Sequence, residues 1–229
     1  MKNINRQHGK YLALLALTAT LAACHHNNDN SDNAKPFIYE VTLLNITQGQ
    51  IFSPPALMTH AAKMKLWQAG ETASLALEKL AEGGDASELS ALSGIHQSQI
   101  SGTPVTPGDS ISWTLEIKKG APFSVSLATM LINTNDGFTG FTDMDLSSLA
   151  LGDSYQKMLA VYDAGTEMNN EVAVPGLGGE GFNASRIGDV NRVYVHAGVL
   201  TTHELSGSNL LPEHKFDNPA GKLTIKRMQ

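Results

Sequence analysis

Length, composition and charge point to one globular domain of ordinary size behind an N-terminal extension. The 229 residues include 16 Lys and Arg, 22 Asp and Glu, and a single cysteine, with a formal charge of −6. This acidic balance argues against nucleic acid as the main partner. A lone cysteine cannot form an internal disulfide, so hydrophobic packing, assisted by a metal ion if one binds, must hold the fold.

The first 23 residues have the pattern of a secretory signal. Three basic residues precede an apolar run over residues 11–23, which leads into Leu21-Ala22-Ala23-Cys24, a sequence typical of a bacterial lipobox. The run is shorter than the roughly 20 residues that a membrane-spanning helix needs. We therefore expect residues 1–23 to be a lipoprotein signal peptide and Cys24 to carry a lipid that anchors the protein to a membrane. A plain signal peptide cut near the same place is the alternative.

Residues 24–36 form a tether in which Ala34 is the only apolar residue between Cys24 and Pro36, and which is not expected to order itself. Removal of residues 1–23 leaves 13 basic residues against 22 acidic ones, a charge of about −9. The residue after Cys24 is His25 rather than Asp. In lipoproteins resembling those of Gram-negative bacteria, this implies sorting to the outer membrane of the cell envelope.

The domain, residues 37–229, is expected to open with a strand and continue with helices. Phe37–Ile46 is rich in β-branched and aromatic residues, as strands are. Ala56–Gln68 and Ala73–Glu82 have apolar residues at near-helical spacing, and Gly83-Gly84 is a helix-ending signal. A short third helix is predicted from Asp85 to Gly94. The prediction is one helical insertion after the first strand.

The rest of the chain is dominated by strands and turns. Ile111–Ile117 alternates apolar and polar residues, the pattern of a half-buried strand. Further strands are predicted over Phe123–Ile132, Tyr155–Tyr162, Val190–Val199 and Gly221–Arg227. Strands at this spacing, with the helices confined to one block, predict a mainly β fold, an antiparallel β-sandwich of C2-like or jelly-roll kind.

Three acids lie on or at the ends of predicted strands. Glu116 is on the polar side of one strand, Asp136 follows another, and Asp163 ends a third. If these strands are neighbours, the carboxylates could converge at one end of the sandwich and bind a hard cation such as calcium. Solvated turn residues are the other interpretation of the same pattern.

Several segments resemble the spondin N-terminal domain, which occurs in F-spondin, in mindin and in bacterial secreted proteins and lipoproteins. They are Tyr39–Thr47, Leu115-Glu116-Ile117, Asn135–Phe141 with Asp145-Leu146, and above all Tyr162-Asp163-Ala164-Gly165-Thr166-Glu167. The resemblance covers roughly residues 37–227. Unlike the animal pattern, this chain has Asn135-Asp136-Gly137 where the family shows a Pro-Asp-Trp type of loop, and it has no cysteine after Asp145-Leu146.

The resemblance implies a C2-like sandwich that binds one calcium ion (Ca2+) through acids at its loop end. Matched by position, the ligands would be Glu116, Asp136 and Asp163. Glu167 would be a further ligand or a residue that contacts the ligands and not the ion. The chain contains no Gly-x-Ser-x-Gly, His-Glu-x-x-His, phosphate-loop or dinucleotide motif, so no catalytic residues are assigned.

The leading hypothesis is a non-enzymatic, calcium-binding, lipid-anchored module for adhesion or for binding a matrix, glycan or protein partner. Two alternatives remain open: a carbohydrate-active enzyme on a jelly-roll scaffold, and a structural subunit of the envelope. An acid pair about 5 to 9.5 Å apart in an open cleft would favour the enzyme.

Overall fold

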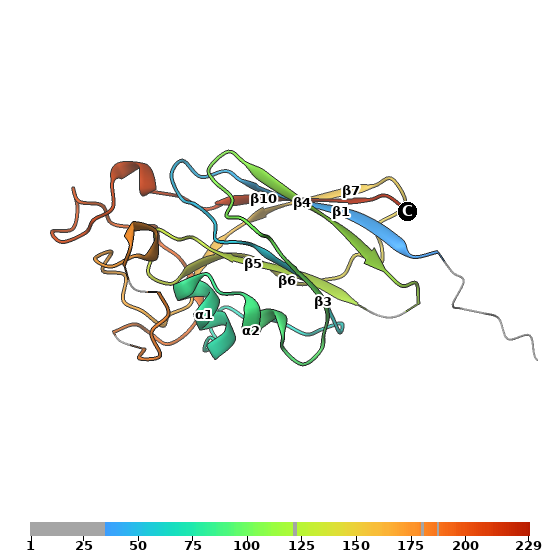
Figure 1. Ribbon diagram of the computed structural model, residues 1–229, viewed down its shortest axis with the longest axis horizontal. Coiled ribbons are helices and arrows are strands. Elements are labelled where there is room, and N and C mark those ends of the chain that lie inside the picture. The colour runs from blue at the N-terminus through green and yellow to red at the C-terminus, as the bar shows by residue number, and fades with distance from the viewer. Residues whose placement is uncertain (1–34, 121–122, 180, 187) are drawn as a thin grey trace, which may run out of the picture. The chain divides into compact units, whose positions relative to one another are not determined.

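The computed structural model describes residues 35–229, except residues 121–122, 180 and 187. The described residues form ten strands in two antiparallel sheets, with α1 and α2 on the outer side of the larger sheet (Figure 1). The predicted antiparallel β-sandwich is therefore confirmed. The predicted signal peptide, the lipidation site Cys24 and most of the tether lie outside the described residues.

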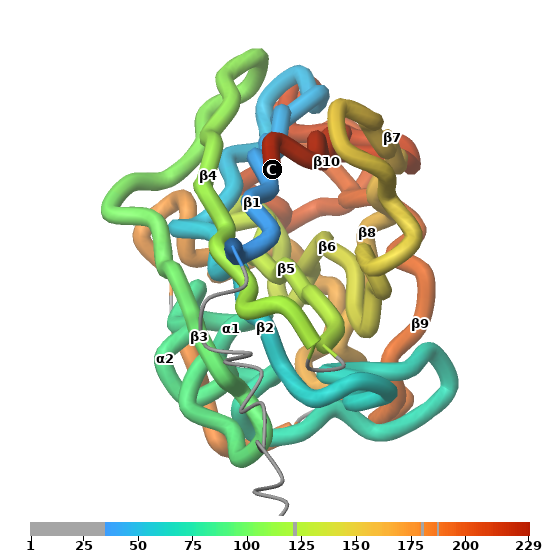
Figure 2. The backbone as a smooth tube through the Cα atoms, turned by 90° about the vertical axis from the view of Figure 1, so that its right-hand side faces the viewer, coloured from blue at the N-terminus to red at the C-terminus, as the bar shows by residue number. Residues whose placement is uncertain are grey.

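The smaller sheet contains, in spatial order, β4 (Ser110–Ile117), β1 (Phe37–Asn45), β10 (Gly221–Arg227) and β7 (Ser154–Leu159). The larger sheet contains β3 (Ile95–Ile100), β2 (Ala56–His60), β5 (Ser124–Met130), β6 (Gly137–Met144), β8 (Val161–Asp163) and β9 (Tyr194–Val195). The helices are α1 (Leu75–Gly83), α2 (Ser87–Ser90) and the short 3₁₀ helices η2 (Pro175–Leu177) and η3 (Pro212–His214). The tube view in Figure 2 shows the strands of the two sheets as two layers.

Strand β1 shows how the sequence pattern builds the layer between the sheets. Tyr39, Val41 and Leu43 are completely buried, whereas the residues between them are exposed or half-buried. Val41 lies opposite Trp113 of β4 and Ile225 of β10, and all three belong to the core between the sheets. Alternate residues of a strand point to opposite faces, so one face of β1 fills the core and the other meets solvent.

The larger sheet is buried on both faces because α1 covers its outer side. Ser74 caps this helix by accepting a hydrogen bond from the Leu77 amide at 3.2 Å. Leu77 and Leu80 of α1 pack with Phe138 of β6 in a second hydrophobic cluster on the outer face. The second and third predicted helices correspond to α1 and α2, and both follow β2.

The helix predicted over Ala56–Gln68 is wrong, because Ala56–His60 forms strand β2 between β3 and β5. All five residues of β2 are buried. Leu57 belongs to the core between the sheets, and Met58 belongs to the cluster under α1. A strand buried on both faces has apolar residues at consecutive positions, and this pattern also satisfies a helical spacing.

The strand predicted over Tyr155–Tyr162 is in fact two strands in different sheets. The chain leaves the smaller sheet at the end of β7 and enters the larger sheet as β8. The Asn218 side chain fixes the crossing, since its Oδ1 accepts a hydrogen bond from the Val161 amide at 2.6 Å. This crossing places Asp163, the last residue of β8, opposite Gly137 of β6. Strands β3 and β6 were not predicted as strands, and the strand predicted over Val190–Val199 is reduced to β9.

Across the part of the chain that the structure describes, no helix has the length and apolar character needed to cross a lipid bilayer.

Candidate metal centre

Three aspartates meet at the end of the larger sheet where β5 ends and β6 begins. Asp136 lies in the turn between β5 and β6, Asp163 ends β8, and Asp189 lies in the loop before β9. One carboxylate oxygen from each lies within 4.8 Å of the others. The first two are brought together by the antiparallel pairing of β6 and β8, because Gly137, the residue after Asp136, is the register partner of Asp163.

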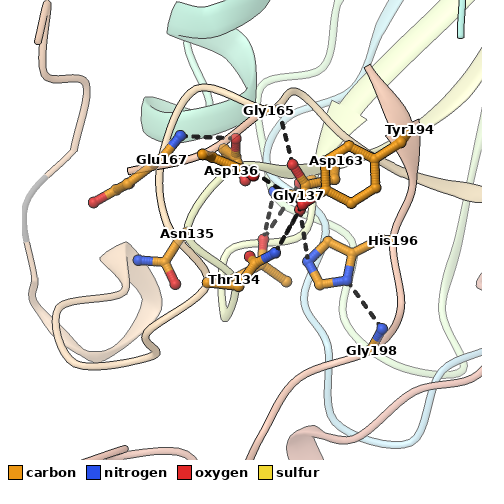
Figure 3. A network of polar contacts seen from close by, with 12 residues as sticks. Thr134, Asn135, Asp136, Gly137, Asp163, Gly165, Glu167, Tyr194, His196 and Gly198 are labelled. Atoms are coloured by element: carbon orange, nitrogen blue, oxygen red, sulfur yellow. Dashed lines mark hydrogen bonds and ion pairs between the residues drawn. The ribbon is translucent and has the colours of Figure 1, made fainter. Parts of the chain in front are cut away.

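Asp136 is completely buried, and its two carboxylate oxygens have different surroundings. Oδ2 accepts hydrogen bonds from the Thr166 amide at 2.8 Å and the Thr166 hydroxyl at 3.1 Å. It also accepts one from the Glu167 amide at 3.1 Å (Figure 3). Oδ1 is buried and has no hydrogen-bond partner among the described residues. A buried carboxylate oxygen without a donor is costly, so Oδ1 is suited to a ligand that carries positive charge.

Asp163 is also completely buried, and it holds the loop that follows β8. Its Oδ1 accepts a hydrogen bond from the Gly165 amide at 2.8 Å, and its Oδ2 accepts one from Asn169 Nδ2 at 2.7 Å. Gly165 has a φ of +71°, and a Cβ atom there would lie 2.2 Å from the carbonyl oxygen of Arg192. Glycine at this position lets the loop after β8 approach the segment before β9 closely enough to form the site.

The two buried carboxylates oppose each other's ionisation. Burial, and next the negative charge of Asp163, raise the pKa of Asp136 to about 8. Burial also raises the pKa of Asp163 above its ordinary value. In the metal-free protein at neutral pH, the pair is therefore expected to hold a proton. A bound cation would favour the ionised carboxylates and so oppose both shifts.

His196 and Tyr194 form the side of the centre nearest β9. Burial lowers the pKa of His196 to about 4, so the imidazole is neutral at neutral pH. Its Nδ1 accepts a hydrogen bond from the Gly198 amide at 3.0 Å, which leaves the proton on Nε2, 3.8 Å from Asp163 Oδ2. This contact is a long dipolar one and not an ion pair. The Tyr194 hydroxyl donates to Asp189 Oδ2 at 3.0 Å and accepts from Asn169 Nδ2 at 3.2 Å.

The structure brings together two of the four predicted ligands, Asp136 and Asp163. Glu167 reaches the centre through its backbone amide, which donates to Asp136 Oδ2 (Figure 3). Glu167 also lines a separate small groove with Glu82.

Glu116 does not join the centre, and its assignment as a ligand beside Asp136 and Asp163 is corrected here. Its side chain is exposed on β4 and lines a groove with Phe123, which precedes β5. Asp136 follows the other end of β5, and seven residues at roughly 3.3 Å each separate the two positions by about 20 Å. Alternation along a strand predicts which face a residue occupies and does not indicate which end of the sandwich it lies near.

Asp189 and its neighbours Asn169 and Tyr194 were not predicted from the sequence. Asp189 lies in an irregular loop, where no periodicity predicts its neighbours. Its contact with Tyr194 depends on the pairing of β8 with β9, which spans two residue pairs. The only local signal was the tyrosine two residues before His196 in a β-rich segment.

The groups that could ligate a metal at this centre suit a hard cation. They are three carboxylates, and one of these has a buried oxygen without a hydrogen-bond partner among the described residues. The neutral His196 carries its proton on Nε2, which faces the carboxylates, so this nitrogen is not available as a ligand. Calcium is bound by carboxylate, amide and carbonyl oxygens in flexible geometries, whereas zinc prefers nitrogen and sulfur ligands.

The two sheets and the three converging aspartates define an antiparallel β-sandwich domain with an acidic cluster between the loops at one end. The Spondin_N family matches residues 47–175, more than half of the chain, and the chain belongs to this family. The resemblance identified in the sequence is thereby confirmed. Asp136 and Asp163 lie within the matched residues, and Asp189 lies beyond them. No curated protein matches the chain. Membership of the family supports an extracellular, adhesion-type module and identifies neither a metal nor a partner.

Proposed function

We propose that this protein is a calcium-binding adhesion module, tethered by an N-terminal lipid to the bacterial cell envelope at the outer membrane. The observation that carries the calcium site is the completely buried pair Asp136 and Asp163, with Asp136 Oδ1 left without a donor within the described residues. Asp136, Asp163 and Asp189 would hold the ion. Calcium would supply the positive charge that this group of acids otherwise lacks.

The proposed ion would act on the loops more than on the sheets. Asp136 belongs to a tight turn between β5 and β6, in which Thr134 Oγ1 accepts a hydrogen bond from the Gly137 amide at 2.9 Å. This turn and the two paired strands already fix the position of Asp136. Asp189, by contrast, comes from a loop with little regular structure. An ion shared between them would hold that loop against the sandwich and stabilise a surface on which an extracellular or envelope protein or a glycan could bind.

A binding role, rather than a catalytic one, is part of this proposal. Asp136 and Asp163 are both completely buried, so a glycosidic bond could not reach them as it would reach an acid pair in an open cleft. The negative charge of the chain also argues for a partner other than nucleic acid.

Calcium titration by calorimetry tests the site. The wild-type protein is expected to bind one calcium ion, and Asp163→Asn is expected to lower the affinity by at least about tenfold, roughly 1.4 kcal/mol. Glu116→Gln is the matched control, because it removes one carboxylate at the other end of the sandwich and should leave the affinity unchanged. Equal affinity in the wild type and Asp163→Asn would exclude Asp163 as a ligand, and a loss in Glu116→Gln alone would exclude the centre described above.

The lipid anchor is tested separately. Cys24→Ser is expected to abolish incorporation of radiolabelled fatty acid and to release the protein from the membrane fraction, because the lipid is attached to the cysteine sulfur. The total amount of the variant protein, measured by immunoblot, controls for its expression. Equal labelling of the wild type and Cys24→Ser would end the lipoprotein hypothesis without affecting the calcium proposal.

A further inference from the structure

A cavity of about 600 Å³ lies beside the acidic centre and is distinct from it. Four segments far apart in the sequence form its walls: Gln48, residues 169 and 171, residues 197–200, and residues 215–217. Its volume is within the range of about 300 to 1,000 Å³ that small-molecule sites occupy. Asn169 lies between the cavity and the centre, since its Nδ2 donates to Asp163 while the residue lines the cavity.

Glu171 is the unusual residue in the cavity wall. It is 1% exposed, and its Oε1 accepts a hydrogen bond from the Leu200 amide at 3.1 Å. Its Oε2 is buried and has no hydrogen-bond partner in the described part of the chain. The Glu171 backbone is held on both sides, because its amide donates to Asn135 Oδ1 and its carbonyl accepts from the Asn209 amide. The carboxylate is therefore fixed in place before any ligand arrives.

The buried side-chain atoms of this cavity that lack a hydrogen-bond partner within the described chain are both acceptors. Besides Glu171 Oε2, the buried Oδ1 of Asn169 lacks a partner among the described atoms. The charges agree with this: Glu171 and Asp217 are acidic, and Lys215, the cation in the wall, already forms an ion pair with Glu204. An anionic ligand would meet two carboxylates, and a neutral ligand would leave the buried Glu171 charge uncompensated.

We propose that this cavity binds an organic ammonium group. A primary ammonium carries three donors and a positive charge, which are what a buried carboxylate oxygen and a buried amide oxygen without partners lack. Phe216 and Val199 supply apolar wall for the carbon body that accompanies the ammonium. The volume is far larger than a bare metal ion needs, and Glu171 is not one of the three acids that converge at the metal centre. This site goes beyond the proposed calcium function and does not depend on it.

The test uses the full-length protein with calcium present and compares amines with neutral molecules of similar shape. The probes are pentylamine against 1-pentanol, and D-glucosamine against N-acetyl-D-glucosamine. We expect at least one amine to bind, measured by calorimetry, at least about tenfold more tightly than its neutral counterpart. The alkylamine and the amino sugar distinguish a simple amine from a saccharide as the source of the ammonium. Equal binding of each amine and its neutral partner, or no binding of either amine at millimolar concentration, would overturn the proposal.

Two variants locate the site. Glu171→Gln keeps an oxygen for the Leu200 amide but puts an NH₂ group where the unpartnered oxygen was, and we expect it to weaken amine binding at least about tenfold. Asp217→Asn, at an exposed wall position, should weaken binding less and does not disturb the core. Glu213→Gln removes an exposed charge that is not in the wall and should bind amines like the wild type.

Calcium titrations of the same variants separate the two sites. Glu171→Gln is expected to retain the calcium affinity of the wild type. Unchanged amine binding in both Glu171→Gln and Asp217→Asn would refute the proposed ammonium site and leave the calcium proposal standing. Absence of calcium binding by the wild-type protein would refute the calcium proposal and leave the ammonium site standing.

Discussion

Asp136→Asn is expected to abolish the response to calcium and, in the absence of metal, to raise the melting temperature of the protein. The asparagine Oδ1 can accept the hydrogen bonds from Thr166 and Glu167 that Asp136 Oδ2 now accepts. The Nδ2 group would then take the place of the unpartnered oxygen and present donors toward the other acids. The substitution therefore removes the cost of burying, or of protonating, an acid beside Asp163 and keeps the packing.

We expect the metal-free gain to be about 1 kcal/mol or more, which corresponds to a rise of roughly 2 to 4 °C for a domain of this size. Asp136→Ala should have the opposite effect and cost about 2 to 4 kcal/mol, because it leaves buried donors without an acceptor. Differential scanning calorimetry with EDTA and with calcium measures both variants. Asp153→Asn, an exposed aspartate changed in the same way, controls for net charge and should behave like the wild type. A calcium response that survives in Asp136→Asn would show that Asp136 is not a ligand.

The metal-free protein is also expected to lose stability as the pH rises from about 6.5 to about 8. The pKa of Asp136 is raised from 3.8 to about 8, so the folded state holds a proton that the unfolded state has already released. Between these two values, stability falls with rising pH by up to about 1.4 kcal/mol per unit. His196 acts in the opposite direction, because its pKa falls from 6.5 to about 4 and the unfolded state binds the extra proton in that range.

The two slopes oppose each other from about pH 4 to 6.5, and only the Asp136 slope remains above pH 6.5. The expected loss from pH 6.5 to 8 is therefore about 2 kcal/mol. Asp163 and Glu171, whose pKa values burial also raises, add to the fall between their ordinary pKa values and their raised values in the folded state. Calcium favours the ionised carboxylates, so it should remove the fall, and its stabilising effect should increase across this range.

Urea unfolding at pH 6.5 and pH 8, with EDTA or with calcium, gives the four free energies of unfolding that are needed. Asp136→Asn is the matched variant, and its metal-free stability should vary much less over this range. A metal-free wild-type protein whose stability is constant or rises from pH 6.5 to 8 would contradict the protonated acid pair.

The sequence by itself was enough to predict the sandwich and two of the three aspartates that converge at its loop end. The alternation in β1 and β4 is a local property, because each residue's face is decided by its position along its own strand. The motif Tyr162–Glu167 likewise carries the local conformation of its loop, including the glycine at 165 that the turn requires. Asp136 and Asp163 were identified because each lies next to such a local signal.

Tertiary structure alone decided the remainder. Strand β2 resembles a helix in sequence because its two faces are covered by different partners, the core between the sheets and α1. Glu116 and Asp136 were expected to be neighbours, but Glu116 of β4 lies beside Phe123, before the start of β5, and Asp136 follows the end of β5. Asp189 reaches the centre through an irregular loop whose path depends on contacts with Tyr194 and Gly165. Convergence of residues far apart in the chain depends on strand order and loop path, and neither leaves a periodic trace in the sequence.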